Sequence, residues 1–386
     1  MNTPEPRPTV SETTARPRKW WSTWRGVVVA VLIGAVVGVL LAVIPVPMVI
    51  YKPGPTLNVL GSQGGEPIIS YEGQQSADDD PAEGELRMVT VSEQGGPGTR
   101  VSVMDLLLAS MNSGYSIYKY SQLYGPQTTA DEVQQANQAQ MTSSHSTATV
   151  AALEYLGYDL PSVITIEDVA EGVPAASVLE PADILVSMQV AGGPVVPMDQ
   201  PGSPFAFLGG VTPGTTVDVT VERAGEQMTL PVETVAPEYP NTDGALLGIV
   251  LSFDIDVPVE VNIHLENIGG PSAGMIFALG IIDEMADTDM TGGQSIAGTG
   301  TMGYDGRVGA IGGIVQKMHG ALRDGSEWFL APAANCGAVV GNEPKGLTVV
   351  AVSNLEDAVA AVTAIGQGNT DALQSCGAYL EAQPAQ

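Results

Sequence analysis

The chain has 386 residues, which suggests two or three domains, since domains average roughly 150 residues. It carries 14 Lys and Arg against 43 Asp and Glu, a formal net charge of −29. This acidic balance argues against nucleic-acid binding, which needs basic side chains to displace counterions from phosphates. With 44% hydrophobic residues, the chain is also too apolar for an acidic disordered protein. Two Cys and three His without metal-ligand spacing predict no metal site and no cofactor.

Basic residues gather directly before the most apolar stretch of the chain. Five of the 14 basic residues lie in positions 1–25, whereas positions 26–386 hold nine basic and 41 acidic side chains. Gly26–Ile44 has 19 residues without a charge, about the length that spans a bilayer core as a helix, and the apolar run continues to Ile50. The pattern predicts a transmembrane anchor over residues 26–50. The positive charge before it predicts that residues 1–25 form a cytoplasmic tail.

Three tryptophans support this membrane assignment. Trp20, Trp21 and Trp24 lie at the start of the apolar run, where an interfacial aromatic belt is expected. A cleaved signal peptide is the alternative, but the run exceeds the usual length of roughly 7–15 residues and no clean A-x-A site follows it. We therefore predict a single-pass protein of the cell membrane whose residues 51–386 lie outside the cytoplasm.

The predicted location changes the interpretation of the two cysteines, Cys336 and Cys376. In an exported domain, a single pair of cysteines favours one disulfide that links the C-terminal part of the chain. Two free thiols are the alternative.

Residues 51–158 contain short β-type runs and one helical pattern. The run 86–91 alternates like a strand, and positions 129–157 place apolar residues at helix-like spacing among polar ones. We assign 51–158 to the first part of the extracytoplasmic region.

Residues 159–237 change to a β-rich pattern with glycine and proline turns. Strand-like runs at 163–166, 184–186, 217–223 and 228–232 are separated by a short helix start at 172–176 and a turn at 181–183. This order resembles a bacterial PDZ domain of the kind attached to envelope proteases. Ala182 replaces the glycine that is usual in one of its turns. The resemblance implies a domain that binds an extended peptide end as an added strand; a small β domain without a peptide site is the alternative.

A serine lies in the sequence GGPSAG at positions 269–274, directly before the apolar helix pattern MIFALGIIDEM. Two glycines predict a turn, and Pro271 suits the first turn of a helix. Ser272 is then placed among free backbone N–H groups, where developing oxyanion charge would find donors. The simpler interpretation is that Ser272 only caps the helix.

A lysine supplies the base that a nucleophilic serine needs, whereas no histidine stands in a motif that suggests a triad. A helix beginning near Gly313 places Lys317 on the same face as Ile314, Met318 and Ala321. A lysine on an apolar face loses its proton readily, because burial lowers its pKa by several units from about 10.4. The neutral amine can act as the general base of a Ser–Lys dyad.

GPSAG at positions 270–274 and IGG-x-x-x-K at 311–317 resemble the two catalytic signatures of Lon-type serine proteases. They stand in the family's order, and Thr299 falls on the threonine that orients the lysine in that family. The resemblance implies peptide-bond hydrolysis in which Ser272 attacks and Lys317 moves the proton. The turn residues expected around the oxyanion are Gly270, Pro271 and Ala273.

The chain departs from cytosolic Lon in two respects. It has no Walker motif, which predicts activity without ATP, and Gly269 stands where Lon usually has Asp. The chain looks like the membrane-anchored PDZ–Lon-like proteases of bacteria. The predicted fold class is α+β: an N-terminal transmembrane helix and a Lon-type α+β proteolytic domain with an inserted PDZ-like β domain. The proteolytic domain with the dyad is assigned to 238–366, followed by a C-terminal tail at 367–386.

The predicted partners are protein or peptide substrates and the membrane, with no nucleic acid. A homo-oligomer is compatible with the sequence, which does not fix the oligomeric state. Two other functions remain open: a peptide-binding scaffold whose Lon-like domain has lost activity, and hydrolysis of a non-peptide ester or amide by the same dyad.

Overall fold

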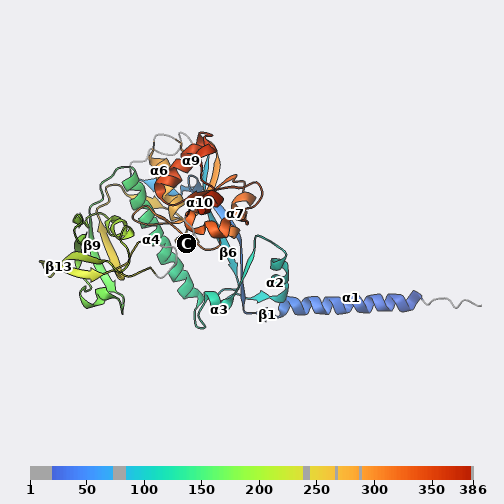
Figure 1. Cartoon of the computed structure of the whole chain (residues 1–386). Coiled ribbons are helices and arrows are strands. Elements are labelled where there is room, and N and C mark those ends of the chain that lie inside the picture. Colours follow the sequence, from blue (N-terminus) through green and yellow to red (C-terminus); the bar gives the residue numbers. More distant parts are fainter. Residues whose placement is uncertain (1–19, 73–83, 238–243, 266–267, 287–288, 384–386) are drawn as a thin grey trace, which may run out of the picture.

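The computed structural model describes residues 20–72, 84–237, 244–265, 268–286 and 289–383. The predicted cytoplasmic tail up to Lys19 lies outside the described residues, as do the side chains of Trp20 and Trp21. The architecture is mixed α+β, as predicted, with one long apolar helix at the N-terminal end (Figure 1).

The N-terminal helix α1 (Trp20–Val43) extends away from the rest of the chain (Figure 1). Its segment Trp24–Val43 is the one helix among the described residues that is long and apolar enough to cross a membrane, with a mean hydropathy of 3.0 and no buried residues. This exposure excludes a core helix, whereas a signal sequence would meet the same criteria of length and composition.

The main sheet has six strands in the order β20-β19-β16-β6-β2-β8. The strands β6, β16, β19 and β20 run parallel to one another, β2 pairs antiparallel with β6, and β8 pairs antiparallel with β2 at the edge of the sheet. Strand β6 comes from the N-terminal part and β16 from the C-terminal part, so this domain needs both halves of the chain. The bounds are β2 Met48–Asn58, β6 Glu85–Gln94, β8 Ser116–Lys119, β16 Ser295–Gly298, β19 Trp328–Pro332 and β20 Thr348–Val352.

Helices cover both faces of this sheet. Alternate residues along a strand point to opposite faces, so Leu86 and Met88 pack with α4 (Ala130–Tyr155), α6 (Gly274–Met285) and α9 (Leu355–Gly366). The opposite face packs against α7 (Ile314–Arg323). The predicted helix at 129–157 is present as α4; Thr129 and Glu132 form a capping box at its start.

The inserted β domain has its own sheet and core. Its antiparallel strands lie in the order β13-β12-β10-β9-β14, with β11 beside β10. Ala182 adopts φ 74°, the left-handed conformation that a glycine normally supplies in this turn. The bounds are β9 Ser162–Val169, β10 Ile184–Val190, β11 Val196–Pro197, β12 Thr216–Arg223, β13 Glu226–Glu233 and β14 Ile249–Ile255, with the helices η1 Pro174–Ser177 and α5 Ser203–Gly209.

The predicted end of this domain at residue 237 is too early. Strand β14 pairs with β9 from Ile249↔Val169 to Ile255↔Ser162, so the sheet continues to residue 255. The pairing joins segments about 90 residues apart along the chain, and such long-range pairing leaves no local pattern in the sequence.

Shorter elements complete the fold. Two-stranded ladders join β1 to β7, β3 to β4, β5 to β15 and β17 to β18. The bounds are β1 Pro45–Val46, β3 Ser62–Gln63, β4 Glu66–Pro67, β5 Ile69–Tyr71, β7 Val101–Ser102, β15 Val261–Ile263, β17 Thr301–Met302 and β18 Val308–Gly309, with the helices α2 Val103–Ser110, α3 Tyr120–Leu123, η2 Ala333–Asn335, α8 Cys336–Val339, η3 Thr370–Ala372 and α10 Cys376–Ala382.

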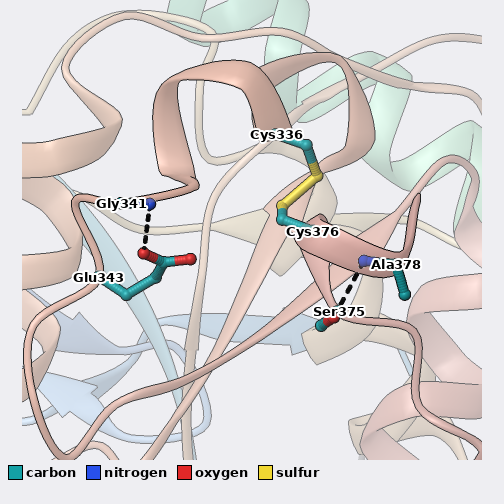
Figure 2. The surroundings of a disulfide bond; sticks show 6 residues. All are labelled: Cys336, Gly341, Glu343, Ser375, Cys376 and Ala378. Atoms are coloured by element: carbon teal, nitrogen blue, oxygen red, sulfur yellow. Dashed lines mark hydrogen bonds between the residues drawn. A yellow bond between two sulfur atoms is a disulfide. The ribbon is translucent and has the colours of Figure 1, made fainter. Parts of the chain in front are cut away.

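A disulfide joins Cys336 at the start of α8 to Cys376 at the start of α10 (Figure 2). Both cysteines are buried, and Ser375 pairs with Val350 of β20. The segment 367–383 is therefore a packed part of the domain that contains the six-stranded main sheet, and the prediction of a tail at 367–386 is wrong for these residues.

We expect removal of the disulfide by Cys336→Ala and Cys376→Ala to lower the unfolding free energy of the domain that contains the six-stranded main sheet by about 3–4 kcal/mol. The reason is that the bridge closes a loop with a sequence separation of 40 residues and restricts the unfolded chain. Denaturant unfolding followed by the fluorescence of Trp328 measures this change, because the other tryptophans, Trp20, Trp21 and Trp24, lie in α1. Identical midpoints for the variant and the oxidised wild type would contradict it.

Candidate active site

Ser272 lies in a turn before α6, not in the first helical turn. The helix begins at Gly274 with Ala273 as its cap, so the prediction that Pro271 occupies the first turn is wrong. The turn is held by the carbonyl of Ser272, which accepts hydrogen bonds from the N–H of Gly300 (2.9 Å) and the hydroxyl of Thr299 (2.8 Å). These contacts fix the backbone while leaving the serine side chain free to face the lysine.

Lys317 projects from α7, which begins after Gly313. Gly313 adopts φ 69°, and a Cβ there would lie 2.6 Å from Val91, so only glycine allows α7 to start this close to β6. The predicted apolar face is present: Ile314, Met318 and Ala321 are buried, and Lys317 is only 3% exposed. The lysine is thus carried into the interior by the packing of its own helix.

The structure brings together the three residues predicted to form the site. Lys317 Nζ lies 2.7 Å from Ser272 Oγ and donates to Thr299 Oγ1 at 2.9 Å. Thr299 is fully buried, so its hydroxyl is held between the lysine amine and the serine backbone. Burial lowers the pKa of Lys317 to about 7. A large fraction of the amines is then neutral near pH 7 and able to accept a proton.

The three histidines take no part in this arrangement. His145 packs edge-on against Phe277 with ring centroids 5.1 Å apart, the ring of His319 lies against Gly114, and the N–H of His264 donates to the backbone of Ile68. No hydrogen bond joins any of them to Ser272 within the described residues. Lysine is therefore the basic group next to the serine.

The three turn residues predicted near the oxyanion have different environments. The N–H of Gly270 already donates to the carbonyl of Asn137 (3.1 Å), and Pro271 has no N–H to offer. The N–H groups of Ser272 and Ala273 donate to no acceptor in the described part of the chain. Ala273 is thus the one residue of the three that could contribute a donor, together with Ser272 itself.

Gly269 lies where helix α4 approaches the serine turn most closely. A Cβ at this position would lie 2.7 Å from the Cβ of Asn137, closer than real contacts allow. An aspartate, as in the family pattern, would require α4 to move. The glycine at position 269, in place of the aspartate of the family pattern, therefore fits the packing of α4 against this turn.

A cavity of about 460 Å³ opens beside the serine and the lysine and is lined on one side by residues 89–93 of β6. Strand β16 pairs with β6 only as far as Met88, and no described strand pairs with residues 89–94 on that side. A second hollow of about 1070 Å³ shares Tyr51, Glu93 and Met141 with the first. Together they form a continuous groove beside an open strand edge.

Two residues that shape the site were missed from the sequence. The side chain of Asn335 holds the loop before α7 through the backbone of Ile311. Asn335 Oδ1 accepts from the N–H of Ile311 (2.9 Å), and Asn335 Nδ2 donates to the carbonyl of Ile311 (3.0 Å). Ser144 of α4 is buried and donates to the carbonyl of Pro271 (3.3 Å). In the sequence, Ser144 could have been recognised as a small polar residue among the apolar positions of the helical pattern. No pattern in the sequence marks Asn335.

No group of three or more His, Cys, Asp or Glu side chains arranged to hold a metal ion is found in the described ranges.

The family model of the Lon protease (S16) C-terminal proteolytic domain matches residues 254–364. The chain is 29% identical over 150 residues to a Lon protease of Azospirillum brasilense, and 31% identical over 140 residues to one of Clostridioides difficile. It is also 32% identical over 106 residues to Lon protease 2 of Herpetosiphon aurantiacus. These matches cover 38%, 34% and 26% of this chain.

Residues 254–364 thus match a Lon-type proteolytic domain, a domain of serine peptidases. Its assigned range, 254–364, contains Ser272, Thr299 and Lys317. The chain spans less than a fifth of the length of the curated relatives: 18%, 18% and 13% in the order above.

Among solved structures, the chain is similar to two PDZ domains of SdrC-like proteins, from Listeria monocytogenes and Listeria innocua. The identities are 20% and 17%, and the TM-score is 0.20 for both. Each similarity covers 23% of this chain, and 85% and 92% of the respective PDZ domains.

We expect Lys317→Met to stabilise the proteolytic domain at pH 6 by about 1–2 kcal/mol, a typical effect of removing a functional but unfavourable group. The folded-state pKa of about 7 lies below the unfolded value of about 10.4. Below pH 7 the wild-type fold carries the full cost of a buried charge, and its stability rises between pH 7 and 10 as the folded chain releases this proton first. The variant lacks this slope, so its advantage at pH 6 is lost or reversed at pH 9.

Denaturant unfolding at pH 6 and pH 9, followed by Trp328 fluorescence, measures the difference. Lys345→Met is the matched control, since Lys345 is exposed. Equal pH dependence in the wild type and Lys317→Met would show that the amine is not held neutral by burial.

Proposed function

We propose that this protein is an ATP-independent serine endopeptidase that uses a Ser272–Lys317 dyad. The observation that carries the proposal is the 2.7 Å distance between Lys317 Nζ and Ser272 Oγ, with the amine buried and its pKa lowered to about 7. The sequence contains no Walker motif, which supports action without ATP hydrolysis by this chain.

In the proposed reaction, neutral Lys317 accepts the proton of Ser272 as the serine oxygen attacks the peptide carbonyl carbon. The oxyanion meets the free N–H groups of Ser272 and Ala273. The ammonium of Lys317 then donates its proton to the leaving amine as the C–N bond breaks, which leaves an acyl-enzyme. Water attacks this ester, and Lys317 accepts the proton of the water and returns it to Ser272.

Thr299 has a positioning role in this scheme. Its hydroxyl donates to the carbonyl of Ser272 and accepts from Lys317 Nζ, so it fixes the amine relative to the nucleophile. Because the hydroxyl is neutral, it orients the amine without raising the amine's pKa as a carboxylate would.

The groove supports an extended peptide as the substrate. The unpaired side of residues 89–93 offers backbone groups to which a peptide can add as a strand, and Ser272 lines the same cavity. An extended backbone is available in unfolded chains and exposed loops, so we propose these as the substrates, rather than folded domains.

We further propose that α1 anchors the protein in the cell membrane, with the N-terminus in the cytoplasm and the proteolytic domain outside it. The support is the apolar segment Trp24–Val43, in which no residue is buried, and the basic residues that precede it in the sequence. The disulfide fits an oxidising compartment.

The inserted β domain is proposed to be PDZ-like, spanning about 159–255, and to capture peptide ends or gate the site. Its contact with the proteolytic domain supports gating. Tyr304 stacks on Phe205 of α5 and lies 4.5 Å from the ring of Phe253 of β14, and Arg307 donates to the carbonyl of Phe205 (3.1 Å). Tyr304 and Arg307 lie in the turn between β17 and β18, directly after Thr299 and Gly300.

We expect Ser272→Ala and Lys317→Ala each to lower the hydrolysis of unfolded casein by about 10³-fold or more, because either change removes one half of the dyad. For the wild type, kcat/KM should rise with pH through about 7 and then level, as Lys317 becomes neutral. Ser62→Ala and Lys345→Met, at exposed positions away from the site, are the matched controls.

Three outcomes distinguish the alternatives. Casein and peptide cleavage that persists in both dyad variants would overturn the proposal. A wild type that cleaves neither casein nor a peptide library, but binds peptides, would indicate an inactive scaffold. Cleavage of model esters alone would indicate a non-peptide hydrolase.

We expect Tyr304→Ala to lower kcat for a short peptide roughly 2–10-fold with little change in KM, because the contact supports the turn that follows Thr299. Steady-state kinetics on the full chain measures both constants. Val195→Ala is the control, since Val195 is an exposed residue of the inserted domain. An unchanged kcat would mean that the inserted domain does not act through this contact and would favour peptide capture alone.

A further inference from the structure

Helix α2 lies beside the end of α1 at which the chain enters the folded region (Figure 1). The N–H of Val103 donates to the carbonyl of Ile44 (3.3 Å), and the ladder of β1 and β7 pairs Pro45 with Ser102 and Val46 with Val101. The first turn of α2 is therefore tied directly to Ile44, the residue that follows α1.

The contact between the two helices reaches into the apolar span itself. Between Trp24 and Val43, the residues that are partly covered are Gly38 and Leu41, and the others are exposed. These two residues are three positions apart and so lie on one face of the helix. Because α1 contacts α2 and β7 in this region, α2 lies level with the last turns of the helix proposed to cross the bilayer.

Helix α2 is apolar on two faces. On its inner face, Leu106 and Ala109 pack into a small core with Ile50 and Val101. On its outer face, three large apolar side chains are exposed at helical spacing: Leu107 by 49%, Leu108 by 62% and Met111 by 84%.

The outer face of α2 also lacks a charged group. The one ionisable residue of the helix is Asp105, which lies at the flank and accepts from the N–H and hydroxyl of Ser102 in a capping box. Helical periodicity places Met104 on the outer side with Leu107, Leu108 and Met111. This face resembles an interfacial membrane helix, with an apolar stripe and polar residues only at its ends.

We propose that α2 is an interfacial helix whose outer face enters the leaflet on the extracytoplasmic side of the membrane. The inference rests on the proposed membrane anchoring by α1. The bilayer is favoured over another protein as the occupant because α2 contacts α1, the helix proposed to cross the membrane, and its exposed face consists of large apolar side chains without a charged group. Burial of these three large apolar side chains in the leaflet removes their surface from water, which favours the inserted position of the helix.

The insertion of α2 fixes the position of the proteolytic site relative to the bilayer. Strand β2 follows β1 directly and carries Tyr51 and Pro55 to the site cavity. At about 3.3 Å per residue, the stretch from Ile44 to Tyr51 measures roughly 20–25 Å. With α1 alone, the ectodomain could tilt about a single attachment point. With α1 and α2 together, it has two attachment points, which fix its orientation relative to the bilayer.

Fluorescence quenching of the full chain in liposomes tests the proposal. Because Cys336 and Cys376 are joined, single cysteines introduced by Leu108→Cys and Met111→Cys can be labelled with an environment-sensitive dye. Lipids carrying nitroxides at defined depths then report contact with the bilayer. Leu40→Cys in α1 is the positive control, and Val195→Cys, 60% exposed on the inserted domain, is the negative control.

We expect roughly twofold or greater quenching at positions 108 and 111, strongest with shallow nitroxides, and little quenching at position 195. Quenching at position 40 but not at 108 or 111 would overturn the α2 proposal and leave the anchor intact. No quenching at position 40 would overturn both. Disulfide cross-linking between two copies of unlabelled Leu108→Cys, together with a label at this position that is shielded but not quenched in the labelled sample, would show that a second copy covers this face and would also overturn the proposal. Casein cleavage by each labelled variant checks that the fold is retained.

Discussion

The burial of one amine is the constraint on which the site depends. Lys317 is the one buried lysine or arginine among the described residues, in a chain of strongly negative charge. Its neighbours within hydrogen-bond distance, Ser272 and Thr299, are both neutral, so burial alone determines the direction of its pKa shift. A nearby carboxylate would stabilise the ammonium and remove the base. Among the described residues, no acidic side chain forms a hydrogen bond or an ion pair with Lys317.

Several distant features serve to hold this amine in place. Gly313 lets α7 begin against β6, and Asn335 fixes the preceding loop at Ile311. Asn335 is followed by Cys336, whose disulfide to Cys376 ties the end of the chain to the same region (Figure 2). The C-terminal segment thus supports the loop from which the lysine helix starts, although it lies nowhere in the cavity.

The sequence predicted the residues of the site well because local patterns carry them. The spacing around Lys317 showed its apolar face, and the two short motifs marked Ser272 and Lys317 across 45 residues. The backbone of the serine turn was not predictable in the same way. Its direction depends on tertiary contacts, such as the hydrogen bond from Gly270 to Asn137 of α4, and those contacts place Ser272 before the helix instead of within it.

The limits of the inserted domain were not predictable for a related reason: β14 is recognised only by its pairing with β9. That pairing also explains how a whole domain fits into the proteolytic fold. Ser162 and Ile255, at the two ends of the insertion, are paired residues, so the chain leaves and re-enters at nearly the same point. The sheet of the proteolytic domain then forms independently of the inserted domain, because β6 pairs directly with β16 in parallel.

A single hinge at the two ends of the insertion would let the inserted domain swing freely. The contact of Tyr304 with Phe205 and Phe253 adds a second attachment, and it falls on the turn that follows Thr299. Under the proposed gating, a movement of α5 or β14 would reach Thr299, and through it Lys317, by way of this turn.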